Sequence, residues 1–258
     1  MLFRSAAVCH SPVPSDAYAS DSDVDRMDLQ ASQIRQQPGV LDVVPLPAVA
    51  GSTPGCAVVS GRAWAALRAA AQASQKLLSD KATSGRVNSA AIEAQMMQVV
   101  QQAAQDDEGF VFHERGEALT AWTQGAINGA RRLEAVYHAP YLAHAPMEPM
   151  NCTVLIHQGK LEMWVPTQVP GLARELAARV AGLSESDVTV HVTYLGGGFG
   201  RRLDLDFVGQ AVQVALKTSP RPVQLLWSRE EDMTHDFYRR SEEHTSELQS
   251  PCNLVCRL

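Results

Sequence analysis

The chain has 258 residues, a formal net charge of −6 and a pI near 5.7. Its basic residues form no stripe, which argues against a nucleic-acid surface, and no apolar run approaches the ~20 residues that span a bilayer. A chain of this length can bury one large core or two smaller ones.

The first 80 residues alternate between short apolar runs and helical patterns, separated by prolines and glycines. This mixed order predicts a small α/β domain over residues 1–80. We expect its strands over residues 4–11, 40–44 and 56–60, and its helices over residues 23–36 and 64–78.

Residues 81–125 are expected to form a linker and a helical insertion. Residues 80–85 are polar, and residues 89–105 have a helical period. A methionine-bearing stripe at helical spacing is typical of a packed core, and nothing marks this one as a cofactor site. The stripe consists of Ile92, Met96, Val99 and Val100.

A second domain is expected over residues 126–239. Pro170 suits the first turn of a helix, and Ser184 is a plausible cap for the short turn that follows. The whole chain is therefore of the mixed α/β (α+β) class. We expect a strand over 133–137, a hairpin of strands 153–157 and 161–165, a helix over 170–181 and a strand over 188–194.

The most informative stretch is GGGFGRR, residues 196–202, between that last strand and a helical pattern over residues 204–217. Glycines allow close backbone approach, and a helix N-terminus with two guanidinium groups suits an anion. The dinucleotide fingerprint needs glycine where Arg201 stands, and the P-loop needs lysine and then serine or threonine after its last glycine. From the loop alone, ligand binding and a simple turn both stay open.

The chain has five cysteines, and three of them lie before residue 240: Cys9, Cys56 and Cys152. They form neither a disulfide framework nor the four-cysteine set of an iron–sulfur cluster. We expect buried free thiols, and any iron–sulfur centre must belong to another chain.

Two other groups of residues suggest chemistry, and we favour neither. His138, His144 and Glu148 have the residue types of a metal site. Asp232 and His235 suggest a hydrolase triad, but the chain has no Gly-x-Ser-x-Gly elbow.

Four ordered motifs resemble the molybdopterin-binding large subunits of the xanthine oxidase superfamily. The loop 197–202 is similar to the family's molybdenum-cofactor loop, and its double arginine resembles the isoquinoline 1-oxidoreductase beta subunit and aldehyde dehydrogenase branch. The other motifs are residues 140–153, 164–170 and 223–232. The resemblance covers residues 4–80 and 126–239, and it implies a hammerhead-like N-terminal domain followed by the first part of a molybdopterin-binding domain.

The resemblance also implies which residues contact the cofactor. The Gln168 amide would approach the metal end, and the loop would contribute close backbone approach and shape. The two arginines would face either cofactor phosphates or acidic side chains such as Asp204 and Asp206. Metal ligands are not expected, because the cofactor's own dithiolene sulfurs hold the molybdenum. The implied cofactor-binding residues are Gln168, Gly197, Gly198, Phe199, Gly200 and Arg201.

The implied enzyme is a molybdenum hydroxylase that oxidises an N-heteroaromatic or aldehyde substrate with water-derived oxygen. Its cofactor would be molybdopterin cytosine dinucleotide, and its electrons would pass to a small [2Fe-2S] subunit. The family's general-base glutamate is expected far downstream, so no catalytic residue is assigned here. Leu203 stands where some members place a substrate-orienting glutamate, which favours an apolar substrate.

Residues 240–258 resemble a translated sequencing adapter, and we expect a non-native tail on a piece of a longer subunit. The compartment stays open between the bacterial cytoplasm and the periplasm. A first alternative is a non-catalytic nucleotide- or anion-binding α/β module that uses loop 196–202, although it gives no reason for Gln168. A second is an assembly subunit that docks through its hammerhead-like region.

Overall fold

The computed structural model describes residues 3–10, 31–79, 88–106, 115–117, 120, 124–125, 131 and 141–240. The expected strand 133–137, most of the expected helix 23–36, the linker 80–85 and nearly all of the tail lie outside these residues. The chain divides into two compact units, one of residues 1–82 with 141–244 and one of residues 83–140 with 245–258. No helix in the described part of the chain is both long and apolar enough to cross a membrane.

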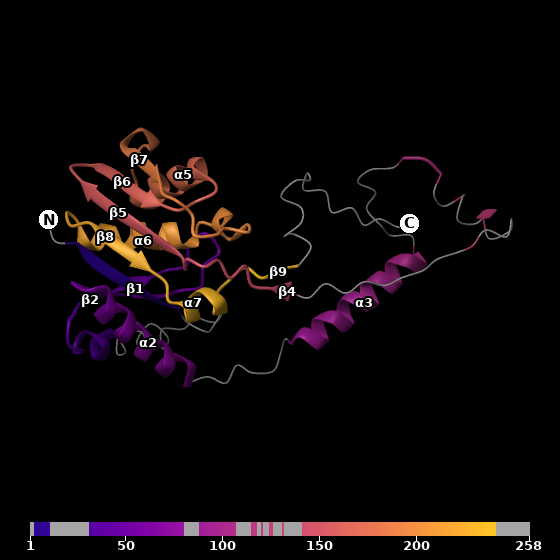
Figure 1. Cartoon of the computed structure of the whole chain (residues 1–258), viewed down its shortest axis with the longest axis horizontal. Helices are drawn as coiled ribbons and strands as arrows, with labels where there is room; N and C mark the ends of the chain where they lie inside the picture. Colours follow the sequence, from indigo (N-terminus) through magenta and orange to yellow (C-terminus); the bar gives the residue numbers. More distant parts are fainter. Residues whose placement is uncertain are drawn as a thin grey trace. The chain divides into compact units, whose positions relative to one another are not determined.

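The first unit is built on one seven-stranded sheet in the order β2-β3-β1-β8-β5-β6-β7 (Figure 1). The β1–β8 and β6–β7 pairs are parallel, and the other four pairs are antiparallel. Strands from both expected domains therefore belong to one sheet, joined where β8 pairs with β1. The strands are β1 (Arg4–His10), β2 (Val40–Leu46), β3 (Gly55–Ser60), β5 (Asn151–His157), β6 (Lys160–Val165), β7 (Val188–Val192) and β8 (Val223–Leu226). A separate two-stranded ribbon pairs β4 (Tyr141–Leu142) with β9 (Arg239–Arg240).

Helices cover both faces of this sheet. Helix α2 (Ala63–Ser79) packs on β1 and β3, whereas α5 (Pro170–Ala181) and α6 (Asp206–Thr218) pack on the β5, β7 and β8 side. Successive residues of β1 enter the two cores in turn, Ala6 and Val8 on the α6 side and Ala7 and Cys9 on the α2 side. A strand buried on both faces is continuously apolar, as residues 6–9 of β1 are.

Local turn chemistry explains the elements that the sequence predicts well. The β5–β6 hairpin turns through Gln158 and Gly159, whose φ angles of 50° and 76° match a two-residue turn. Helix α5 has the predicted bounds, with Pro170 in its first turn. It ends at Gly182, which has a φ of 66°, as a left-handed C-cap residue should.

Several expectations differ from the structure. Strand β7 ends at Val192, two residues earlier than predicted. Helix α6 begins at Asp206, two residues later than predicted, because Arg201–Leu203 form a separate 3-10 turn, η3. The turn η2 (Glu185–Asp187) follows Ser184, but the Ser184 side chain makes no capping hydrogen bond. In the second unit, helix α3 (Ser89–Asp106) leaves Val99 and Val100 56% and 63% exposed, so these two residues are not core.

Candidate functional site

The loop after β7 has an unusual backbone. Gly197, Phe199 and Gly200 have φ angles of 100°, 54° and 94°, which lie in the left-handed region. Glycine adopts this region freely, but a phenylalanine there is strained and needs support from its surroundings. Phe199 is also 51% exposed, so the loop presents an aromatic side chain at the surface. Such strain is often found at ligand sites.

Two glycines of the loop lie very close to neighbouring side chains, and a larger residue at either position would force the neighbour to move. A Cβ atom at Gly198 would lie 2.8 Å from Gln168 Oε1, and one at Gly196 would lie 2.3 Å from Glu148 Cβ. The loop is therefore pressed against the segment after β6, which supplies Gln168, and against the segment before β5, which supplies Glu148.

Arg202 ties these three segments together from beneath. It is fully buried, and its guanidinium donates to the carbonyls of Gly197 (2.8 Å), Pro166 (3.1 Å) and Glu148 (2.9 Å). It also forms an ion pair with Glu148 Oε2 at 2.8 Å. Burial lowers the pKa of Arg202, and Glu148 opposes this effect. The side chain shapes the loop and does not reach its outer surface.

Glu148 completes this support. Its Oε2 accepts from the Gly196 amide at 2.9 Å, and its own amide donates to the Gly196 carbonyl at 3.0 Å. Its Oε1 accepts from Asn151 at 2.8 Å. Glu148 thus supports the loop from beneath.

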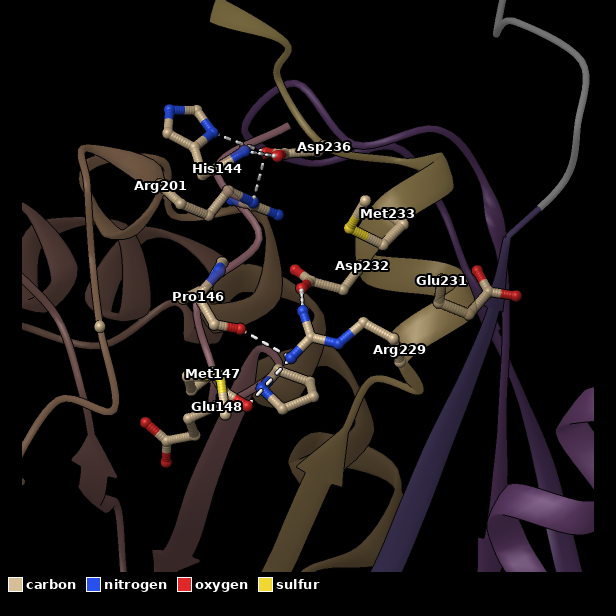
Figure 2. A network of polar contacts seen from close by, with 12 residues as sticks. His144, Pro146, Met147, Glu148, Arg201, Arg229, Glu231, Asp232, Met233 and Asp236 are labelled. Carbon is tan, nitrogen blue, oxygen red and sulfur yellow. Dashed lines mark hydrogen bonds and ion pairs between the residues drawn. The ribbon is translucent and has the colours of Figure 1, made fainter. Parts of the chain in front are cut away.

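Arg201 is also fully buried, and it faces carboxylates. Its guanidinium forms a bidentate pair with Asp206 (3.1 and 2.9 Å) and lies 3.1 Å from Asp236. Burial lowers the pKa of Arg201, but these two carboxylates raise it further, so the group is firmly charged. Asp236 also accepts from the backbone and ring of His144 at 2.6 and 2.9 Å (Figure 2). Of the two roles left open by the sequence, pairing with acidic side chains is the one observed.

A third arginine holds the segment before β5 in place. Arg229 opens helix α7 (Arg229–Thr234), and in Figure 2 it lies between Asp232 and the carbonyls of Pro146 and Met147. The corresponding distances are 2.7, 2.6 and 2.9 Å. The sequence motif at 223–232 did not indicate this role, although Ser228, whose hydroxyl caps α7, marks where the helix begins.

The expected cofactor-binding residues fall into two layers. Gln168 and Phe199 are exposed, and Gly197, Gly198 and Gly200 are half-buried beside them, so these five share one surface. Arg201 lies beneath that surface. The arrangement presents neutral hydrogen-bonding groups and an aromatic ring outward, and it keeps both guanidinium groups inside.

A second polar cluster, which the sequence did not predict, lies at the end of β1. His10, Glu231 and His235 bring one ligand atom each to within 4.8 Å of one another. The Glu231 Oε2 atom is 2.8 Å from His10 Nδ1 and 3.3 Å from His235 Nδ1. Two of these residues line a cavity of about 220 Å³ together with Asp206, Trp227, Asp236 and Phe237.

Hydrogen bonds around His10 favour a proton network at this cluster over a metal site. The Trp227 indole can only donate, and it donates to Gln210 Oε1 at 3.1 Å. The Gln210 amide nitrogen therefore donates to His10 Nε2, 2.7 Å away. The His10 proton must then be on Nδ1, where it donates to Glu231. A metal would need that nitrogen's lone pair, and a metal-bound histidine usually donates through its other nitrogen.

The described residues of the two constellations that the sequence did not favour have other partners. His144 is bonded to Asp236 and Glu148 to Arg202, while His138 lies outside the described residues. Asp232 pairs with Arg229. The three cysteines outside the tail are free thiols; Cys9 and Cys152 are buried as predicted, whereas Cys56 is only half-buried.

Comparison with known proteins points to one family. A family model described as the molybdopterin cofactor-binding domain matches residues 104–249, which include the start of the expected tail. The chain is 31% identical over 137 residues to isoquinoline 1-oxidoreductase subunit beta of Brevundimonas diminuta, a match that covers 48% of this chain and 17% of that protein. It is 30% identical over 107 residues to a membrane-bound aldehyde dehydrogenase (pyrroloquinoline-quinone) of Gluconacetobacter polyoxogenes, covering 42% and 14%. The chain thus spans less than a fifth of the length of these relatives.

Solved structures show the same fold. Quinoline 2-oxidoreductase from Pseudomonas putida 86 superimposes with a TM-score of 0.53 at 17% identity, covering 89% of this chain and 31% of that one. Carbon monoxide dehydrogenase from Oligotropha carboxidovorans gives 0.53 at 15% identity, covering 93% and 33%. The expected mixed α/β fold is confirmed.

Proposed function

Because this chain belongs to the molybdopterin cofactor-binding domain family, we propose that it is part of the catalytic subunit of a molybdenum hydroxylase. The surface of Gln168 and loop 196–200 would hold the metal end of the cofactor. The observation behind this proposal is the contact between Gly198 and Gln168, which places an exposed amide beside the loop that carries the exposed Phe199 ring.

The residues present fit such a cofactor. A large planar group needs backbone that can approach closely and neutral donors that fix its orientation. Gly197 and Gly198 provide the first, and the Gln168 side chain provides the second. When bound, the molybdenum centre would supply the two-electron oxidation that introduces a water-derived oxygen into the substrate.

Each protein group would then have a distinct part. Gln168 would donate its amide N–H toward the metal end of the cofactor and orient it. Phe199 would exclude water from one side of the reacting region. Arg202 and Glu148 would keep the loop rigid, and Arg201 would act through Asp206 and Asp236, without touching the cofactor itself. The general base would come from another part of the full subunit.

The finer identities rest on the resemblance and on the surface around the loop. We propose an N-heteroaromatic or aldehyde substrate, since Tyr194, Phe199 and Leu203 expose apolar side chains there. The double arginine supports the cytosine dinucleotide form of the cofactor and a separate [2Fe-2S] subunit. We also propose that residues 1–80 are the hammerhead-like region, whose strands extend the shared sheet.

The anion-binding alternative loses its main support. It requires guanidinium groups that face a ligand, whereas Arg201 and Arg202 are both 0% exposed and paired. Helix α6 also begins with Asp206, whose negative charge disfavours an anion at the N-terminus of this helix.

The test is the molybdenum and CMP content of the complete subunit, co-expressed with its small [2Fe-2S] partner in a host that makes the cofactor. Equimolar molybdenum and CMP are expected. A Gln168→Leu variant should fold normally and hold less molybdenum. A folded wild-type subunit that contains neither would contradict the proposal.

A further inference from the structure

Two cysteines face each other across neighbouring strands. Cys9 of β1 is directly opposite Cys56 of β3 in the antiparallel register. Both side chains belong to the core on the α2 side of the sheet. The strands come very close at the next pair, where a Cβ atom on Gly55 would lie 2.3 Å from the Cys9 carbonyl oxygen.

This arrangement lies within reach of a disulfide bond. Directly opposed residues of an antiparallel pair have Cα atoms about 4.5–5.5 Å apart, and disulfides join Cα atoms about 4.4–6.8 Å apart. The Cys9 and Cys56 thiols are already in hydrogen-bond contact. A bond between them needs side-chain rotation and no change of strand register.

The two thiols have different surroundings. Cys9 is completely buried, whereas Cys56 is partly exposed. The hydrogen bond from Cys9 lowers the pKa of Cys56, while the same bond and burial raise the pKa of Cys9. Cys56 is therefore the thiol that a reagent meets first, and its lowered pKa favours reaction there.

A route for the second proton leads away from Cys9. The Ser74 hydroxyl is 3.1 Å from Cys9 Sγ and 2.7 Å from Glu231 Oε1. The single Ser74 proton can be donated to Cys9 or to Glu231. When Ser74 donates to the ionised Glu231, its oxygen is free to accept the Cys9 proton once Cys56 has reacted and no longer accepts it. Glu231 also lies 3.3 Å from His235 Nδ1, so a second group can share the transferred proton.

We propose that Cys9 and Cys56 form a redox-active dithiol that a small-molecule disulfide converts into a cross-strand disulfide. The Cys56 thiolate attacks one sulfur of the reagent, and one thiolate of the reagent leaves. Cys9, losing its proton through Ser74 to Glu231, then attacks the Cys56 sulfur and releases the second thiolate. Two protein thiols and one reagent disulfide thus become one protein disulfide and two reagent thiols.

The test uses the full chain with Cys252→Ser and Cys256→Ser, reduced, freed of reductant and treated with oxidised glutathione. Intact mass and peptide mapping should show the loss of two hydrogens and a Cys9–Cys56 linkage. Cys152 is the internal control, because it is completely buried and burial raises its pKa. It should stay unmodified throughout.

Three variants separate the steps. Cys9→Ser should stop at a stable glutathione adduct on Cys56, and Cys56→Ser should leave both remaining thiols unreacted. Ser74→Ala should slow the second step by about two- to tenfold, the effect of one lost hydrogen bond. The proposal is overturned if the parent chain also stops at the adduct, or if Cys152 reacts as fast as Cys56.

Discussion

The glycine loop and the end of β1 are both held by buried charged side chains, but their partners differ in kind. Beneath the loop, Arg201 and Arg202 are bonded to carboxylates and backbone carbonyls, and arginine keeps its charge at any physiological pH. At the end of β1, Glu231 meets two histidines, and burial lowers the pKa of one of them, His235, from its ordinary 6.5. The first region should therefore keep its shape as conditions vary, and the second should respond to pH and to oxidants.

Removing one arginine tests the first half of this comparison most severely. Arg201→Met leaves Asp206 and Asp236 without their cation, and an unpaired buried charge costs about 3–5 kcal/mol. We expect the free energy of unfolding, measured by urea denaturation, to fall by that amount. Arg62→Met, at an exposed arginine, is the matched control and should change it by less than about 0.5 kcal/mol. Equal effects of the two variants would show that the buried pair contributes nothing special.

The Arg229 clamp should show a smaller effect of the same kind. Arg229→Met leaves the buried Asp232 carboxylate and two carbonyls unpaired, which should cost about 2–3 kcal/mol. Burial already raises the pKa of Asp232 against the pull of Arg229, so this variant should lose less stability at low pH than at neutral pH. Urea denaturation at both pH values checks this, with Asp232→Asn in the same background as control. Equal losses at both pH values would exclude Asp232 as the cause.

Acidification tests the second half of the comparison. Burial and the neighbouring His10 lower the pKa of His235 from its ordinary 6.5, so the unfolded chain binds this proton first and stability falls as pH drops below about 6.5. Burial raises the pKa of Glu231, but its hydrogen bonds and nearby histidines lower it overall, so its contribution is lost only below its ordinary 4.5. The free energy of unfolding, measured by urea denaturation, should therefore decrease as the pH is lowered between these two values in the wild type. It should decrease less in His235→Gln. A variant that declines as steeply as the wild type would contradict this assignment.

The smallest effect on stability is expected at the proposed contact surface. Gln168 is exposed, and Gln168→Leu should change the free energy of unfolding by less than about 0.5 kcal/mol. Molybdenum retention by the complete subunit should nevertheless fall, because the orienting amide is gone. Glu162→Leu, an exposed change on β6, should leave both quantities unaltered. A Gln168→Leu subunit that keeps its full molybdenum content would place the orienting group elsewhere.

Local patterns predicted what local forces determine. The β5–β6 hairpin follows from a turn that needs positive φ at Gln158 and Gly159, and helix α5 follows from Pro170 at one end and Gly182 at the other. The pairing of β1 with β8 could not be predicted in this way. It joins Arg4 to Val223, and no periodicity within either strand identifies such a distant neighbour.

The same limit applies to the candidate site. The glycine motif indicated where the loop lies, but the direction of Arg201 depends on Asp236, which comes from beyond α7. His10 and Glu231 are 221 positions apart, so their cluster gave no sequence signal. The partner of a buried charged residue is set by the tertiary fold. A local sequence motif contains only one of the two partners, so it does not identify the pair.

The position of β8 between β1 and β5 affects how the chain folds during its synthesis. Strands β1, β2 and β3 are translated early. The second neighbour of β1, strand β8, is translated about 160 residues after the end of β3, which takes roughly 8–30 s at bacterial rates of synthesis. During that interval the nascent chain exposes an unpaired apolar strand edge, which invites pairing with other chains. Slower translation, or a chaperone that covers the edge of β1, should therefore decide how much of this polypeptide reaches its folded state in a cell.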